Sequence, residues 1–80
     1  MSTSSVRVEP LAIDVRVTED ALRVVLADGR EISVPLAWFP RLQEASPEQL
    51  RKWRLIGGGI GIHFPDVDED VSIDSLLASR

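Results

Sequence analysis

The residues best suited to chemistry in this chain lie in one short segment, between positions 57 and 70. The segment contains four of the five glycines, the only histidine and four of the thirteen acidic residues. Glycines can expose backbone N–H groups to a ligand, and imidazole with carboxylates can bind a metal ion. The same residues can also form nothing more than a tight connection between two elements. The sequence is compatible with all three interpretations.

The acidic residues of this segment resemble part of a calcium-binding loop. Asp66, Asp68 and Asp70 have the spacing of its first three ligands. The later positions that should be glycine and glutamate are Val71 and Leu77, so the match ends there. We therefore expect a solvated acidic turn and predict no metal site. The alternative is a small metal- or ligand-binding domain, with His63, Asp66, Asp68 and Asp70 as its ligands.

The residues that most enzymes use are largely missing from this sequence. Cysteine is absent, which excludes thiol nucleophiles, thiolate metal sites and disulfides. His63 could transfer protons, but no serine lies in a Gly-x-Ser-x-Gly motif that would make it a nucleophile. The glycines match neither of the common nucleotide-binding motifs. We predict that the chain is not an enzyme and that it has no cofactor.

The charge distribution favours a protein partner. We do not expect nucleic-acid binding, because such binding depends on many contacts with negative phosphates and the chain has a net charge of −4. The acidic residues from position 66 onward are opposed by Arg80 alone, which predicts an acidic surface that either meets a basic partner or only keeps the domain soluble. No segment resembles a signal peptide or a membrane span, so we expect no membrane contact and a cytoplasmic location.

The first half of the chain predicts a β-meander. Residues 1–10 are expected to be a flexible tail, and residues 11–80 a single compact domain. Apolar residues alternate over 13–17, and a two-residue turn at Glu19-Asp20 would place Val17 opposite Leu22. The dipeptide Asp28-Gly29 is a strong hairpin signal before a third strand, which should end at a proline.

The second half predicts short helices and short strands. Ser46-Pro47-Glu48-Gln49 has the pattern of a capped helix start, and we expect this helix to continue until glycines 57–59 end it. A short strand over 61–64 should follow, and then residues 71–73, either as a further short strand or as the lead-in to a helical turn capped by Asp74. The predicted fold class is α+β, with a small antiparallel sheet (the meander plus one or two short strands) packed with two short helices. The predicted core residues are Val15, Val17, Leu22, Val24, Leu26, Ile32, Val34, Leu42, Leu50, Trp53 and Ile62.

Several runs of this sequence resemble one bacterial family, a small domain of unknown function numbered 2442. The runs are Asp28-Gly29-Arg30, the segments 34–42 and 46–53, and the stretch from Ile56 to Asp70 with the later Leu76-Leu77. Phe64 stands where the family usually has tryptophan. The resemblance implies a small α+β domain with no assigned reaction and no catalytic residues. Some members are joined to a helix-turn-helix domain, and others are encoded beside a second small protein in arrangements like toxin–antitoxin pairs.

We therefore expect a non-enzymatic protein-interaction module, of which an antitoxin that neutralises a small basic protein is one form. Its oligomeric state is not predicted. Exposed tryptophan and arginine are frequent in binding hot spots, and the acidic run supplies charge. The predicted interaction residues are Trp38, Arg41, Asp66, Asp68, Glu69 and Asp70.

Overall fold

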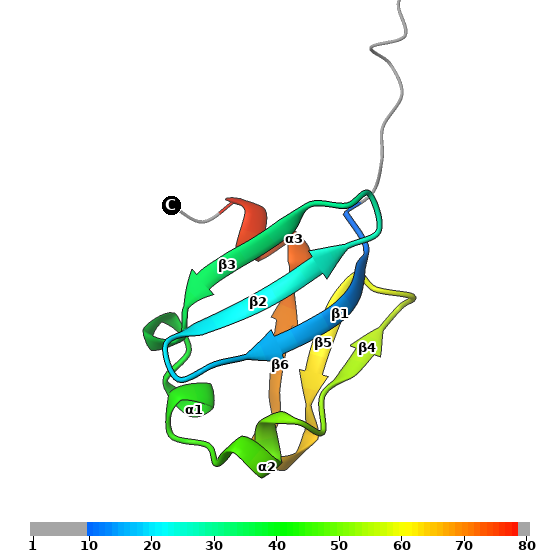
Figure 1. Ribbon diagram of the computed structural model, residues 1–80. Coiled ribbons are helices and arrows are strands. Elements are labelled where there is room, and N and C mark those ends of the chain that lie inside the picture. The colour runs from blue at the N-terminus through cyan, green and yellow to red at the C-terminus, as the bar shows by residue number, and fades with distance from the viewer. Residues whose placement is uncertain (1–9, 79–80) are drawn as a thin grey trace, which may run out of the picture.

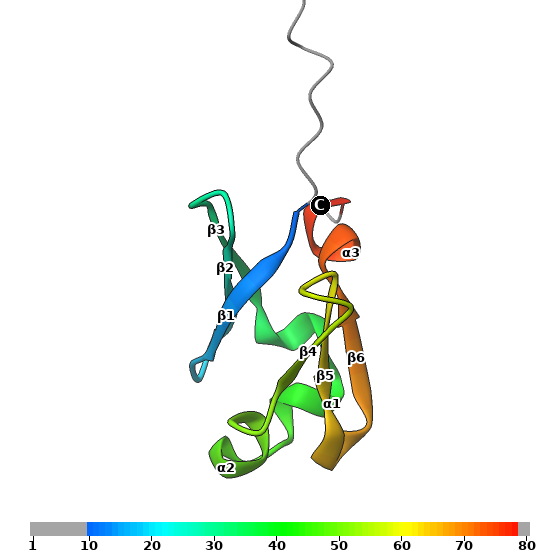
Figure 2. The same cartoon turned by 90° about the vertical axis from the view of Figure 1, so that its right-hand side faces the viewer.

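The computed structural model describes residues 10–78, and in them the chain forms two three-stranded antiparallel sheets connected by short helices (Figure 1). Figure 2 shows the sheets as separate layers, with the α1–α2 segment between their lower ends. The predicted α+β class is confirmed, although the later strands form a second sheet of their own. The predicted tail, residues 1–10, lies outside the described residues except for Pro10.

The first sheet is the predicted meander of β1 (Ala12–Val17), β2 (Ala21–Leu26) and β3 (Glu31–Pro35). Val17 lies opposite Leu22, as the two-residue turn predicted, and the N–H of Thr18 donates to the carbonyl of Ala21 at 2.9 Å. A bulge follows Ala12, where one extra residue, Ile13, interrupts the register. β1 and β3 are the two edges of this sheet.

The turn between β2 and β3 lies at the predicted dipeptide. The N–H of Leu26 donates to the carbonyl of Arg30 at 2.8 Å, so the loop has three residues between this pair. Gly29 has a φ of 96°, whereas Asp28 keeps a negative φ. Only one positive φ is needed in this loop, and glycine supplies it without steric cost.

Short helices connect the two sheets. The 3₁₀ turn η2 (Leu36–Trp38) is followed by α1 (Pro40–Gln43) and α2 (Pro47–Leu50). The predicted cap of α2 is present: Ser46 Oγ accepts from the N–H of Gln49 at 3.2 Å, and Gln49 Oε1 accepts from the N–H of Ser46 at 3.0 Å.

The predicted continuation of this helix to residue 56 is wrong. α2 ends at Leu50, and β4 (Arg54–Ile56) begins the second sheet. Glycines 57–59 are therefore not a helix end but the turn of a β-hairpin, and their φ values are 60°, 74° and 117°. The N–H of Ile60 closes this turn on the carbonyl of Ile56 at 3.0 Å.

The second sheet continues with β5 (Gly61–Phe64), the 3₁₀ turn η3 (Pro65–Val67) and β6 (Glu69–Ser72), and α3 (Ile73–Ala78) ends the described chain. The predicted cap of this last helix, Asp74, lies inside its first turn instead. The side-chain cap comes from Ser72, whose Oγ accepts from the N–H of Ser75 at 3.3 Å.

The core fills the space between the inner faces of the two sheets. Eight of the eleven predicted core residues are buried, while Val17, Ile32 and Trp53 are partly buried and pack against the core. The prediction omitted part of the core because most of it belongs to the second sheet and to α3. The omitted buried residues are Ala12, Leu36, Phe64, Val71, Ile73 and Leu76.

Candidate functional site

The acidic residues lie on the hairpin that connects β5 to β6. Pro65 starts the 3₁₀ turn η3, and Asp68 then adopts a left-handed conformation with φ 54° and ψ 47°. Aspartate tolerates this conformation better than most residues, which allows the chain to reverse direction there. Asp66, Asp68 and Asp70 are exposed and Glu69 is half-buried, so the segment is a solvated acidic turn.

Two basic side chains from the helical segment hold this turn in place. Arg41, on α1, donates from Nη1 to the backbone carbonyl of Asp68 at 3.2 Å. Lys52, just after α2, lies with Nζ 3.2 Å from Oδ2 of Asp66. The structure thus brings Arg41 to the acidic run, from which it is 27 residues distant in the sequence. Because both contacts are made within the folded chain, the turn is organised before any partner binds.

Two of the acidic side chains in this turn have no polar partner in the described part of the chain. The carboxylates of Asp68 and Glu69 make no hydrogen bond or ion pair within residues 10–78. Arg41 contacts the backbone of Asp68 and leaves the carboxylate of that residue free. Trp38, in η2, keeps 43% of its surface exposed, and no hydrogen bond in the described part of the chain connects it to the turn. Of the predicted interaction residues, Trp38 is therefore the one that the structure does not connect to the others.

The only histidine lies in a row of polar side chains across the outer face of the second sheet. Arg54, His63 and Asp70 are cross-strand neighbours on β4, β5 and β6. Nδ1 of His63 is 2.5 Å from Oδ1 of Asp70. Ser72 shares this face, but its hydroxyl caps α3. The geometry therefore shows an imidazole held by a carboxylate.

The four residues of the alternative metal site are only partly brought together. His63 contacts Asp70, whereas Asp66 pairs with Lys52 on the other side of the turn. Within the described range, no group of three His, Asp or Glu side chains is placed to hold a metal ion. A zinc site needs at least three protein ligands, and calcium needs more oxygen ligands still.

One feature was not predicted from the sequence, a groove that runs along the free edge of β1. It consists of two adjoining hollows of about 470 and 260 Å³, which share Val17, Thr18, Pro47 and Leu50. One wall is β1, and the other comes from a segment about 30 residues later in the chain. This second wall includes Arg51 and Trp53, which lie beyond the end of α2 at Leu50. A sequence-based prediction that continued this helix could not place them there.

Comparison with known proteins identifies the family of this domain, and that family has no described function. Residues 12–80 match the model of the family described as "Protein of unknown function (DUF2442)", and the chain belongs to this family. Among functionally curated proteins, none matches the chain.

Two solved structures share this fold. A crystal structure of a protein of unknown function from Rhodospirillum rubrum is 30% identical, with a TM-score of 0.76 over 88% of this chain and 87% of that one. A solution structure of an uncharacterised protein from Chromobacterium violaceum is also 30% identical, with a TM-score of 0.71, and the match covers 84% of this chain and 63% of that one. Neither protein has an assigned activity in its description.

The helices of the described residues are all too short to cross a membrane.

Proposed function

We propose that this domain is a non-enzymatic protein-interaction module that uses its acidic turn to bind a basic partner. The binding surface consists of the carboxylates of Asp66, Asp68, Glu69 and Asp70, with Arg41 behind them. A small basic protein that the domain neutralises, in the manner of an antitoxin, fits this surface. We expect the module to act in the cytoplasm.

The observation that carries the proposal is the contact between Arg41 and the carbonyl of Asp68. A turn of four acidic residues in five would otherwise repel itself and sample many conformations. Arg41 and Lys52 anchor its backbone and one carboxylate, while the carboxylates of Asp68 and Glu69 stay unpaired within residues 10–78. A fixed surface with free negative charge binds a basic partner at a lower entropic cost and steers its approach.

Affinity capture from a bacterial lysate at low and high salt, followed by mass spectrometry, tests the proposal. The bait is the full chain, and the comparison is Asp68→Lys with Glu69→Lys. These two residues are chosen because their carboxylates make no hydrogen bond or ion pair in the described chain, so their reversal removes no contact of Asp66. We expect one stoichiometric basic protein that the wild type retains and the reversed variant loses.

The matched control reverses Asp20 and Glu44, two exposed acidic residues that lie in other turns. It changes the net charge by the same amount, so a partner that depends on the acidic turn should still bind it. A partner that both reversed variants lose to the same extent responds to overall charge, and this result would contradict the proposal. Capture that is unchanged in both variants would contradict it as well.

A further inference from the structure

The free edge of β1 faces a groove, and within residues 10–78 most of its outward backbone groups there are unpaired. The N–H of Thr18 bonds across to Ala21 on β2. In an antiparallel ladder, alternate residues point their N–H and C=O groups to opposite sides, so Val15 and Val17 point theirs away from β2. Asp14 Oδ1 accepts from the N–H of Val15 at 2.9 Å. The C=O of Val15 and both backbone groups of Val17 are left to face the groove.

The groove runs parallel to this edge. The larger hollow extends along Val15 to Thr18, and the smaller one continues from Val17 to Glu19. The opposite wall runs in the reverse direction, from Trp53 through Leu50 and Pro47 to the end of α1 at Gln43 and its core-facing Leu42. An extended peptide added to β1 would therefore lie between a strand edge and an apolar wall, which is the geometry of strand addition.

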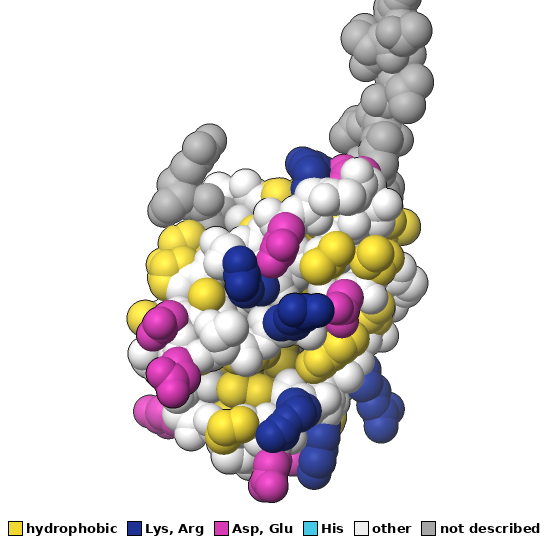
Figure 3. Space-filling model, viewed as in Figure 1, with side chains coloured by type: hydrophobic (Ala, Val, Ile, Leu, Met, Phe, Trp, Pro, Cys, Tyr) yellow, Lys and Arg dark blue, Asp and Glu magenta, His cyan; other side chains and the backbone are white. Residues whose placement is uncertain are grey.

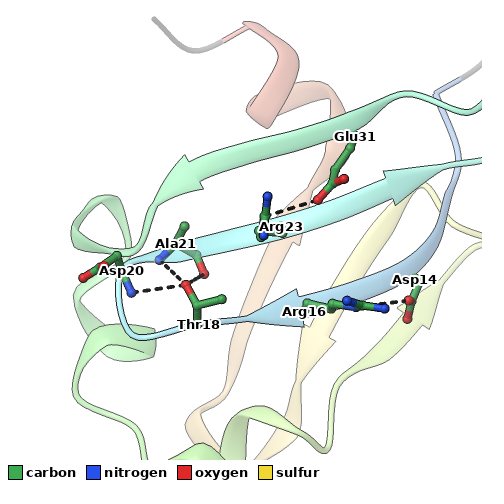
Figure 4. Close-up of polar contacts among 7 residues, drawn as sticks. All are labelled: Asp14, Arg16, Thr18, Asp20, Ala21, Arg23 and Glu31. Carbon is green, nitrogen blue, oxygen red and sulfur yellow. Dashed lines mark hydrogen bonds and ion pairs between the residues drawn. The ribbon is translucent and has the colours of Figure 1, made fainter.

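The wider end of the groove has basic residues on both sides. Arg16 projects from β1 with 76% of its side chain exposed, and its one ion pair, to Asp14, is long at 3.9 Å (Figure 4). Arg51, at the end of α2, makes no ion pair within the described residues. Figure 3 shows basic side chains over the first sheet and again lower on the same face. By contrast, Arg23 on the neighbouring strand is paired with Glu31 at 3.2 Å.

This charge distinguishes between possible occupants. The chain as a whole carries a net charge of −4, yet the wide end of the groove presents two guanidinium groups with little local neutralisation. A second copy of the domain pairing through β1 would bring another Arg16 against this end, and like charges would oppose each other. A peptide with a carboxylate at this position would complement both arginines.

We propose that this groove binds an extended acidic peptide, which adds a strand to β1. Its backbone pairs with Val15 and Val17, an apolar side chain packs against Trp53 and Leu50, and a carboxylate lies between Arg16 and Arg51. This surface is separate from the acidic turn, and its binding does not depend on the function proposed above. The domain would then have two faces of opposite charge for two kinds of partner.

The test uses a synthetic peptide of alternating valine and glutamate, acetylated and amidated, titrated into the ¹⁵N-labelled full chain. We expect a saturable shift of the Val17 amide signal and, in a Trp38→Phe background, a change in Trp53 fluorescence. The same peptide with lysine in place of glutamate should bind at least about tenfold more weakly. Val17→Pro removes the outward N–H without removing a ladder bond, so it should weaken binding while thermal melting shows that the variant still folds.

Charge controls complete the experiment. Arg16→Gln with Arg51→Gln should weaken binding about tenfold, whereas Arg23→Gln with Arg30→Gln, which changes the net charge equally, should leave it within about twofold. The proposal is overturned if the glutamate peptide produces no saturable shift of the Val17 signal. It is also overturned if both arginine pairs have the same effect, or if the Val17 signal instead moves with protein concentration as a dimer forms.

Discussion

The N–H of Ala12 donates a 2.8 Å hydrogen bond to the carbonyl of Gly59, and this bond connects β1 of the first sheet to the glycine turn of the second. A Cβ atom at position 59 would lie 2.5 Å from the carbonyl oxygen of Ala12. Gly59 is buried and has a φ of 117°. The close approach of the two sheets at this point therefore requires glycine.

Gly59→Ala should destabilise the domain severely. The substitution combines an unfavourable φ with an overlap against the backbone of Ala12, and we expect a loss of about 4 kcal/mol or more in the free energy of unfolding. Gly58→Ala is the matched control, because Gly58 has a φ of 74° but no neighbouring atom within 4 Å of the place that a methyl group would take. It should cost about 1 to 2 kcal/mol. Urea denaturation measures both, and equal losses would contradict the proposed close approach.

The capping box of α2 gives a second stability prediction. Ser46→Ala removes the hydroxyl that accepts from the N–H of Gln49, and we expect a loss of about 1 kcal/mol. Gln49→Ala removes the reciprocal bond, while Gln43→Ala changes an exposed glutamine for which no side-chain hydrogen bond occurs in the described chain. Thermal melting should show lower stability for the first two variants and little change for the third. A Gln43 variant as unstable as the Gln49 variant would show that the box does not stabilise α2.

The parts of this fold that could be predicted are those specified by short-range patterns in the sequence. The meander was predicted because alternation and turn residues are short-range features, and the Val17–Leu22 pairing followed from the length of one turn. The capping box was equally local. It marks where a helix begins, however, and contains no information about where that helix ends.

The end of α2 was missed because a β-hairpin, formed by the pairing of β4 with β5, competes with the helix for the residues after Leu50. Arg54 pairs with His63, and this pairing with β5 outweighs the helical tendency of the residues after Leu50. Three consecutive glycines end a helix or turn a hairpin equally well. The isoleucines at positions 56 and 60, which flank the glycines, were the available signal for a hairpin, since β-branched residues favour strands.

The sequence predicted which residues belong to the candidate site, but not how they are arranged in space. The acidic run was apparent from charge alone, and Arg41 was grouped with it as a hypothesis. Their contact depends on how α1 packs against the β5–β6 hairpin, which no local pattern specifies. The groove along β1 lies between the first sheet and the helical segment that follows it, and it could not be derived from either alone.

The loop between β2 and β3 gives a pH-dependence prediction. The pKa of Asp28 is lowered, chiefly because the N–H of Arg30 donates to its carboxylate at 3.0 Å, with a further contribution from the Arg30 side chain at 2.8 Å. A pKa that is lower in the folded state stabilises the fold above the unfolded value, about 3.9. This contribution is lost as the pH falls through the lowered pKa of the folded state.

Asp28→Asn should therefore be less stable than the wild type at neutral pH, and the difference should shrink below about pH 4. Urea denaturation at a series of pH values measures it. Arg30→Gln keeps the backbone donor, which is the largest cause of the lowered pKa, and should retain most of the pH dependence. Parallel loss of stability in the wild type and the Asp28 variant down to acidic pH would contradict the assignment.

The last prediction concerns the effect of divalent ions on the Tm. A metal-binding domain should be stabilised by them, whereas an interaction module without a metal site should not. The structure places His63 beside Asp70 but pairs Asp66 with Lys52, so among residues 10–78 too few ligands converge for Zn²⁺ or Ca²⁺. An ion that binds the folded state at a hundred times its Kd would stabilise it by about 2.7 kcal/mol and raise the Tm of a domain of this size by several degrees. We expect the Tm to stay within about 1 °C in millimolar ZnCl₂ or CaCl₂. A rise that His63→Gln and Asp70→Asn both abolish would instead establish a metal site in the folded domain, and the acidic turn would then have to be reconsidered as part of that site.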